Sequence, residues 1–170
     1  MNKLVLTLLF LSVCVLQSCS KKEANTESAT ETETPAAPVN EQPSFSIILL
    51  DNTQVNLKDL TGKNVLVFFQ PDCDHCQREA QEFERNLEAF GSATLYFITS
   101  GPMEDIKAFA DTYKLSGKPN VHFAFTPALN VLNTYGPISA PSIYVYSEDH
   151  KLVKGFNGET PIERIIAAAK

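Results

Sequence analysis

The sequence predicts an α/β fold with a central mixed sheet, parallel in its middle, helices on both faces and an N-terminal β-hairpin. Strand patterns alternate with helix patterns along residues 44–170, which is the order expected of such a sheet. Two strand candidates, 64–70 and 94–99, are largely apolar, as in strands that are covered on both faces. The main helix candidate, 75–90, carries its apolar residues on one stripe and can therefore cover a sheet face.

Each element has its own local signal. Two short strands flank the turn at residues 51–53 and predict the first hairpin. The apolar residues of the helix at 75–90 are spaced by 4, 3, 4 and 3, and Gly91 follows as a stop. A polar turn at 147–151 predicts a second hairpin, and Pro161 occupies the first position of the last helix. The expected strands cover residues 45–50, 54–57, 64–70, 94–99, 121–125, 142–146 and 152–156, and the expected helices cover 75–90, 103–113, 128–135 and the segment from 160.

The composition excludes several classes of protein. The 170 residues suffice for one domain of ordinary size with short appendages. Hydrophobic residues make up 44% and charged residues 20% of the chain, a globular average that excludes a disordered chain and a polytopic membrane protein. The formal net charge is −6. We therefore expect no nucleic-acid partner, because an acidic protein repels phosphates.

The first residues have the pattern of an export signal. A basic start precedes an apolar run of thirteen residues, Leu4–Leu16. This run is too short for a membrane-spanning helix, which takes about 20 residues, but it has the length of a signal-peptide core. Residues 16–19, Leu-Gln-Ser-Cys, resemble the lipobox of bacterial lipoproteins, which implies cleavage after Ser18 and lipidation of Cys19. Alternatively, Cys19 is incidental in an ordinary secretory signal; both interpretations export the chain.

A polar segment is expected to connect the anchor to the domain. The 24 residues from 20 to 43 include five Glu and three of the ten prolines, but no aromatic residue. Such a segment buries too little apolar surface to offset its ordering entropy, and as a coil it spans about 25–30 Å. We therefore expect a signal peptide at 1–18, a lipidated cysteine and flexible tether at 19–43, and a domain at 44–170. The expected location is the cell envelope, with a lipid anchor in the membrane and the domain in the periplasm.

Two cysteines lie where the strand at 64–70 passes into the helix at 75–90. Cys76 falls on the apolar stripe of the helix and is expected to be buried. Cys73 falls at the helix start, where free N–H groups and the helix dipole stabilise a thiolate. Because the thiolate is the nucleophile, the pattern predicts that Cys73 attacks a substrate and that Cys76 resolves the mixed disulfide.

A structural disulfide and a zinc site are the alternatives for this pair. A disulfide that closes so small a loop gains little stability from chain entropy. A structural zinc site takes four ligands, and the chain has no second cysteine pair in the domain and only His122 and His150 as distant imidazoles. Both alternatives are therefore weaker than redox chemistry.

The domain at 44–170 resembles the TlpA/ResA-like branch of the thioredoxin superfamily, which is related to the AhpC/TSA fold. The resemblance rests on the Val-Asn-Leu-Lys-Asp-Leu-Thr-Gly-Lys segment at 55–63, the Cys-x-x-Cys pair, the Ala-Pro-Ser segment at 140–142 and Gly158. It implies a thioredoxin-like fold without a bound cofactor. It also implies a thiol–disulfide oxidoreductase that exchanges disulfides with protein substrates, more often as a reductant, and that depends on an unidentified redox partner.

The same resemblance implies roles for further residues. A cis bond between Ala140 and Pro141 would present backbone polar groups beside the sulfurs, where a substrate peptide can pair; a trans turn proline is the alternative. Glu79 would assist proton transfer around the buried Cys76, since a desolvated carboxyl has a raised pKa. The alternative for Glu79 is a solvated residue of an acidic helix.

The sequence also departs from the family pattern. Asp72 stands where the family usually has Trp, and the chain contains no Trp. Asp72 and Asp74 should oppose thiolate formation, whereas a protonated His75 should favour it, so these three residues are expected to tune the redox potential.

Two other functions remain open. A thiol peroxidase would carry Thr three residues before its cysteine, whereas Gln70 precedes Cys73 at that position. A copper-handling protein of related fold would bind the metal through two cysteines and a distal His, and it usually separates the cysteines by three residues rather than two.

Overall fold

The computed structural model describes residues 40–170, so the predicted signal peptide, Cys19 and most of the predicted tether lie outside the described residues. No helix within residues 40–170 combines the length and apolar character that a membrane crossing requires. Residues 41–43, expected at the end of the tether, contact the domain. Glu41 forms a β-bridge with Lys151, and the buried Gln42 donates its amide N–H to the carbonyl of Leu57. The packed part of the chain thus starts before the expected boundary at Ser44.

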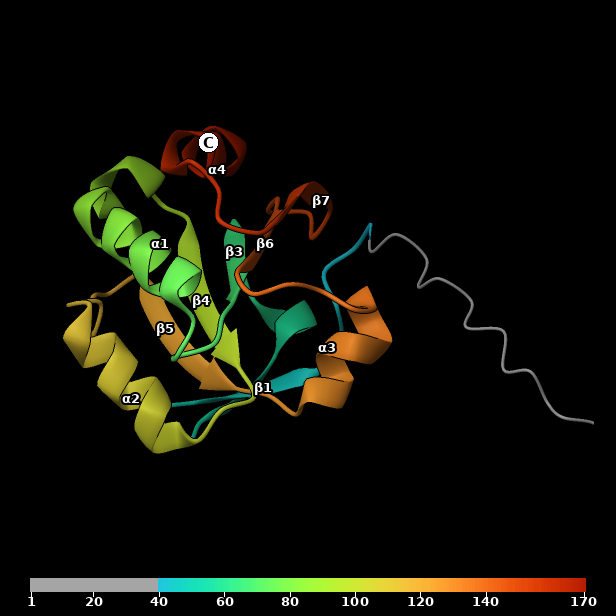
Figure 1. Cartoon of the computed structure of the whole chain (residues 1–170). Helices are drawn as coiled ribbons and strands as arrows, with labels where there is room; N and C mark the ends of the chain where they lie inside the picture. The colour runs from blue at the N-terminus through green and yellow to red at the C-terminus, as the bar shows by residue number, and fades with distance from the viewer. Residues whose placement is uncertain (1–39) are drawn as a thin grey trace, which may run out of the picture. The chain divides into compact units, whose positions relative to one another are not determined.

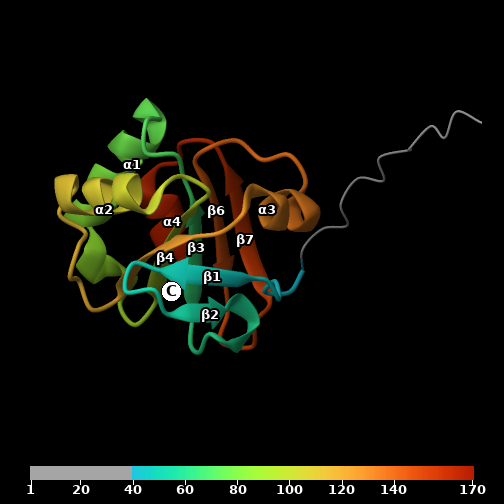
Figure 2. The ribbon, with the colours of Figure 1, turned by 90° about the horizontal axis from the view of Figure 1, so that it is seen from below.

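The described strands form one seven-stranded mixed sheet in the order β2-β1-β5-β4-β3-β6-β7 (Figure 1). β3 and β4 are parallel, as are β4 and β5, whereas β6 is antiparallel to both β3 and β7. The hairpin β1–β2 joins the sheet through antiparallel pairing of β1 with β5 (Figure 2). The strands are β1 (Ser46–Leu49), β2 (Gln54–Asn56), β3 (Asn64–Phe68), β4 (Thr94–Thr99), β5 (Val121–Phe125), β6 (Ser142–Tyr146) and β7 (Leu152–Asn157).

Helices cover both faces of this sheet (Figure 1). Apolar residues of α1, α2 and α4 share one core with Val65, Val67 and Phe97, whereas residues of α3 and η1 pack on the other face with Leu66 and Phe68. The prediction of a central mixed sheet with helices on both faces and an N-terminal hairpin is confirmed. The helices are α1 (Asp74–Arg85), α2 (Met103–Thr112), α3 (Ala128–Tyr135) and α4 (Ile162–Ala169), with the 3-10 helices η1 (Leu57–Asp59) and η2 (Leu87–Phe90).

The predicted helix at 75–90 ends earlier than expected, at Arg85. Asn86 follows it, and its side-chain amide donates to the carbonyl of Glu82 at 2.8 Å while its backbone N–H donates to the carbonyl of Phe83. These two hydrogen bonds satisfy carbonyls that the helix end would leave free. The chain continues as η2, which still buries Phe90 in the core. The apolar spacing was therefore a true signal of burial but not of an unbroken helix.

Strand pairing brings three distant segments to one edge of the sheet. Ser142, at the start of β6, lies opposite Phe68 at the end of β3 and opposite Asn157 at the end of β7. The segment before β6 must therefore lie beside the segments that follow β3 and β7. The Cys-x-x-Cys pair, the Ala140–Pro141 bond and residues 158–160 meet at this edge.

Replacing Phe83 by alanine is expected to lower the free energy of unfolding by about 3–5 kcal/mol, because the cavity left in a close-packed core cannot fully collapse. Phe83 is fully buried, and its ring contacts those of Phe90 and Phe97 at centroid distances of 5.3 Å each. Leu129, on exposed α3, is the control, and Leu129→Ala should change stability by no more than about 0.5 kcal/mol. Urea unfolding followed by circular dichroism measures both values. Equal losses in the two variants would contradict the packing described here.

Candidate active site

Cys73 caps the N-terminus of α1 and is only half-buried. Its backbone N–H donates to the carbonyl of Gln70 at 3.2 Å, and this turn sets Cys73 at the end of the segment that leaves β3. Its Sγ accepts the backbone N–H of Cys76 at 3.4 Å. Sγ therefore lies among the free N–H groups of the first helical turn, which favour negative charge on the sulfur.

Cys76 lies one helical turn later, and only 3% of its surface is exposed. It packs in the core with Ala80 and Phe83 of the same apolar stripe, so the predicted burial is confirmed. Neither Cys73 nor Cys76 forms a disulfide in the structure. Burial raises the pKa of the Cys76 thiol to about 12, and the hydrogen bond and charge of Cys73 and the charge of Glu79 raise it further. Cys76 is consequently a neutral thiol at neutral pH while Cys73 is reduced.

The Ala140–Pro141 peptide bond is cis, as the resemblance implies. The thiol of Cys73 donates to the carbonyl of Ala140 over 3.6 Å, so backbone polar groups do lie beside the sulfur. The carbonyl of Pro141 accepts the backbone N–H of Gly158 at 2.8 Å. This contact connects the segment before β6 to the segment after β7.

Glu79 is 3% exposed and lies one turn beyond Cys76 on the inner side of α1. Its Oε1 accepts the backbone N–H of Thr160 at 3.0 Å, whereas its Oε2 has no hydrogen-bond partner among the described residues. Burial raises the pKa of the Glu79 carboxyl to about 7; the hydrogen bond from Thr160 opposes this rise and the charge of Glu159 adds to it. The alternative of a solvated Glu79 is therefore wrong.

The exposed side of the site carries three polar side chains expected to tune it. Asp72, Asp74 and His75 are all exposed. His75 Nδ1 lies 2.6 Å from Glu159 Oε2 and 2.7 Å from Arg78 Nη2. Because a ring nitrogen either donates or accepts, His75 makes one of these hydrogen bonds at a time. The contacts of His75 thus run to Glu159 and Arg78 rather than to Cys73.

Arg78, Glu159 and Thr160 belong to the site, although the sequence did not single them out. Arg78 donates two hydrogen bonds to Glu159, from Nε to Oε1 at 3.0 Å and from Nη2 to Oε2 at 2.7 Å. This contact lowers the pKa of the Glu159 carboxyl to about 2. Arg78 could have been noticed, because it lies one turn after His75 on the same helix face. Glu159 and Thr160 could not, because 81 residues separate each of them from its partner on α1.

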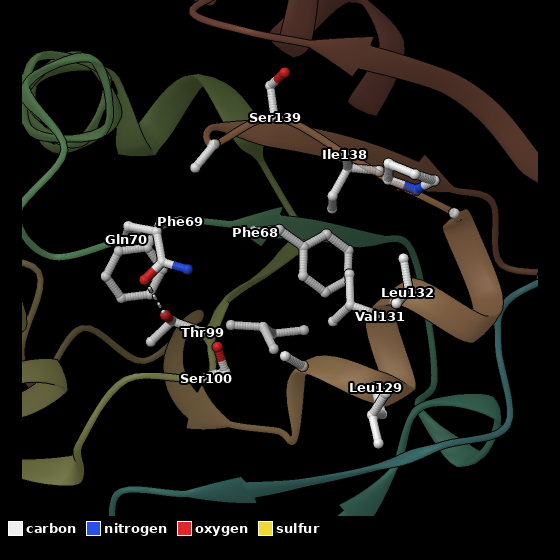
Figure 3. A pocket seen from close by; sticks show the side chains of 15 residues that line it. Phe68, Phe69, Gln70, Thr99, Ser100, Leu129, Val131, Leu132, Ile138 and Ser139 are labelled. Carbon is white, nitrogen blue, oxygen red and sulfur yellow. Dashed lines mark hydrogen bonds between the residues drawn. The ribbon is translucent and has the colours of Figure 1, made fainter.

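Ala140 also lines an apolar cavity of about 320 Å³. Figure 3 shows this cavity from close by. It lies between α3, the segment before β6 and the ends of β3 and β4, and Figure 3 shows Phe68 and Ile138 beside Val131 and Leu132 of α3. Leu132 is 47% exposed at its rim. We call this cavity the α3 groove. No sequence pattern indicated it, because its wall combines residues from 68–70, 98–100 and 128–140, which lie far apart in the chain.

The histidines considered for a metal site lie elsewhere. The ring of His122, in β5, stacks on Tyr96 at a centroid distance of 5.1 Å, and His150 lies in the turn between β6 and β7. Within residues 40–170, no three His, Cys, Asp or Glu side chains are arranged so that they could hold a metal ion. Neither His122 nor His150 therefore forms a metal-binding group with the cysteine pair in the described part of the chain.

Comparison with known proteins agrees with this geometry. The profile of the AhpC/TSA family matches residues 38–154. The thiol-disulfide oxidoreductase ResA of Bacillus thuringiensis subsp. konkukian is 24% identical over 129 residues, which cover 74% of this chain and 72% of ResA. A candidate peroxiredoxin of Mycobacterium tuberculosis is 27% identical over 115 residues, which cover 65% of this chain and 71% of the relative.

A solved structure confirms the thioredoxin-like fold. A secreted disulfide oxidoreductase of Mycobacterium tuberculosis, described as homologous to E. coli DsbE, has a TM-score of 0.63 with this chain at 18% identity. The match covers 74% of this chain and 94% of that protein. At this identity the similarity shows the fold, and the activity has to be argued from the site.

Glu79→Gln is expected to stabilise the protein at pH 8 but not at pH 4. The pKa of Glu79 rises from 4.5 to about 7 on folding, so the folded state binds more protons between these values and loses stability as the pH rises through them. Glutamine does not titrate and escapes this loss, which amounts to at most about 3 kcal/mol. Urea unfolding at both pH values measures the difference, with Glu88→Gln at an exposed position as the control. An equal effect of Glu79→Gln at both pH values would show that the carboxyl titrates normally.

Proposed function

The chain belongs to the AhpC/TSA family, and within it we propose that the protein is an exported thiol–disulfide oxidoreductase that exchanges disulfides with protein substrates. The observation that carries this proposal is the asymmetry of the two thiols. Cys73 lies half-exposed at the N-terminus of α1, whereas Cys76 lies beneath it with 3% of its surface exposed. One sulfur can meet another protein, and the second can react only with the first.

The proposed reaction has two steps. The Cys73 thiolate attacks one sulfur of a substrate disulfide, so a Cys73–substrate disulfide forms, the substrate S–S bond breaks, and the first substrate thiolate leaves and takes up a proton. Cys76 then loses its proton and attacks Cys73 Sγ, which releases the second substrate thiol and leaves a Cys73–Cys76 disulfide. The substrate gains two electrons, so an external dithiol partner must reduce the protein again.

Glu79 is proposed to accept the proton of Cys76 in the second step. The hydrogen bond and the charge of Cys73 both raise the pKa of the Cys76 thiol. A mixed disulfide on Cys73 removes that charge, so the thiol becomes easier to ionise when it has to react. A buried carboxyl whose pKa is about 7 is suited to take up and return a proton near neutral pH.

The surroundings of Cys73 support a polypeptide substrate. The Ala140 carbonyl beside Cys73 Sγ and the α3 groove next to it offer an extended chain a backbone acceptor and an apolar surface. The similarity to ResA, which is named a thiol-disulfide oxidoreductase, supports thiol–disulfide exchange as the reaction. Among the two directions of electron flow we propose that the protein acts as a reductant, with Asp72, Asp74 and His75 adjusting its potential.

Export and anchoring complete the proposal. We propose that residues 1–18 are removed, that Cys19 is lipidated, and that the segment to residue 43 holds the domain near a membrane of the cell envelope, on its periplasmic side. A solved structure of similar fold is described as secreted. Cell fractionation tests this arrangement: Cys19→Ser should move the protein from the membrane to the soluble fraction, and an unchanged membrane fraction would contradict it.

A thiol peroxidase is the second candidate, because one relative is a candidate peroxiredoxin. Gln70, rather than Thr, lies three residues before Cys73, which weighs against it. Parallel assays of insulin reduction and hydrogen peroxide consumption with the same reductant separate the two. We expect insulin to be reduced faster; the reverse order would favour the peroxidase.

Cys73→Ser is expected to abolish insulin reduction, because the exposed nucleophile is lost, whereas Cys76→Ser should accumulate a covalent complex that only Cys76 could resolve. Non-reducing gel electrophoresis after incubation with an oxidised protein substrate shows the complex. Comparable complexes with both variants would mean that the two thiol roles are assigned wrongly.

A further inference from the structure

Three consecutive residues after β7 each contact a different part of the site. The N–H of Gly158 donates to the Pro141 carbonyl, Glu159 pairs with Arg78 and His75, and the N–H of Thr160 donates to Glu79. Gly158 has a φ of +84°, which glycine adopts without strain, and this conformation starts the reversal of the chain. We call residues 158–160 the clamp loop.

Only one side chain of the clamp loop fastens it to α1. The Arg78 guanidinium makes a bidentate interaction with both carboxylate oxygens of Glu159. This geometry lets an arginine fix the orientation of a carboxylate. Arg78 and Glu159 are 52% and 36% exposed. An ion pair this accessible to water adds little stability. Its structural effect is to fix where the loop lies.

The loop position decides how the Glu79 carboxyl is held. The backbone N–H of Thr160 donates to Oε1 and leaves Oε2 as the oxygen without a partner among the described residues. Since the N–H stabilises charge on Oε1, the proton resides on Oε2. The hydrogen bond thereby selects the oxygen that exchanges the proton.

We infer that Glu159 is a positioning residue: through its ion pair with Arg78 it holds the clamp loop so that the Thr160 N–H orients Glu79 for proton exchange with Cys76. The inference rests on the proposed function, in which Glu79 takes the proton of Cys76. As Cys76 Sγ attacks the mixed disulfide at Cys73, the proton passes from Cys76 to Glu79 Oε2, and the Cys73–substrate bond breaks.

Other charged groups lie near Glu79, and their effect on its pKa has to be distinguished from the effect of Glu159. The thiol of Cys76 on α1 interacts electrostatically with Glu79, and a hollow beside Glu79 is lined by Glu82 of α1, Glu159 of the clamp loop and Glu163 of α4. Glu82 pairs with Arg85 at 2.6 Å. Because Glu82 has the charge of Glu159 but does not hold the loop, Glu82→Ala is the matched control.

The test follows the two thiols separately. Full-length variants carry Cys14→Ser and Cys19→Ser, so that 5,5′-dithiobis(2-nitrobenzoate) reports on Cys73 and Cys76 alone. In stopped flow, the first release of thionitrobenzoate marks attack by Cys73, and the second marks resolution by Cys76. The pH midpoint of the second phase reports the proton acceptor of Cys76.

Glu159→Ala and Glu159→Gln are expected to shift this midpoint in opposite directions. In Glu159→Ala the loop is free and the Thr160 N–H no longer donates to Glu79. That hydrogen bond lowers the pKa of Glu79 more than the charge of Glu159 raises it, so the loss of both raises the pKa. The midpoint should therefore rise, by up to about 0.5 pH unit. Glutamine still accepts a hydrogen bond from Arg78 but carries no charge, so the midpoint should fall. The first phase should stay within about twofold of the parent rate.

Three further variants complete the test. Arg78→Ala frees the loop but keeps the Glu159 charge and should also raise the midpoint, whereas Glu82→Ala should not. A fall of equal size in Glu159→Ala and Glu159→Gln would show that only charge matters and would overturn the positioning role, as would an unchanged midpoint in Glu159→Ala. Glu79→Gln should abolish the pH dependence of the second phase; if it does not, the proposed role of Glu79 itself fails.

Discussion

The antiparallel pairing of β6 between β3 and β7 is the constraint on which the site depends. It places Ser142 opposite Phe68 and Asn157, so the segments next to these three residues meet at one edge of the sheet. The thiols, the cis bond before β6 and the clamp loop are brought together by the backbone hydrogen bonds of this pairing. Because the backbone fixes these positions, the buried Glu79 carboxyl and the buried Cys76 thiol can lie close together, although a charge on one makes ionisation of the other less favourable.

Burial divides the chemistry between the two sulfurs. Cys73 lies at a helix start, where the backbone N–H of Cys76 donates to its sulfur, and Cys76 lies in an apolar core, where ionisation is unfavourable. The same desolvation raises the pKa of Glu79 and makes this carboxyl a suitable partner for a thiol that must lose its proton late. The order of the two proposed steps thus follows from where each group lies relative to water.

Local sequence signals predicted much of the fold and the central part of the site. Apolar periodicity is a short-range property, so the strands and helices and the burial of Cys76 could be predicted, while the end of α1 depended on the cap at Asn86 and was missed. Glu79 was suggested by a family resemblance. The pairing of Arg78 with Glu159 and the α3 groove join segments far apart in the chain, and no local pattern encodes such contacts.

The central claim is that one thiol is accessible and ionisable while the other is shielded. Brief treatment of the reduced protein with limiting iodoacetamide at neutral pH, followed by peptide mass spectrometry, tests it most directly. The account predicts that Cys73 is alkylated first and that Cys76 remains unmodified until the protein is unfolded. Alkylation of Cys76 at the rate of Cys73 in the folded protein would contradict it.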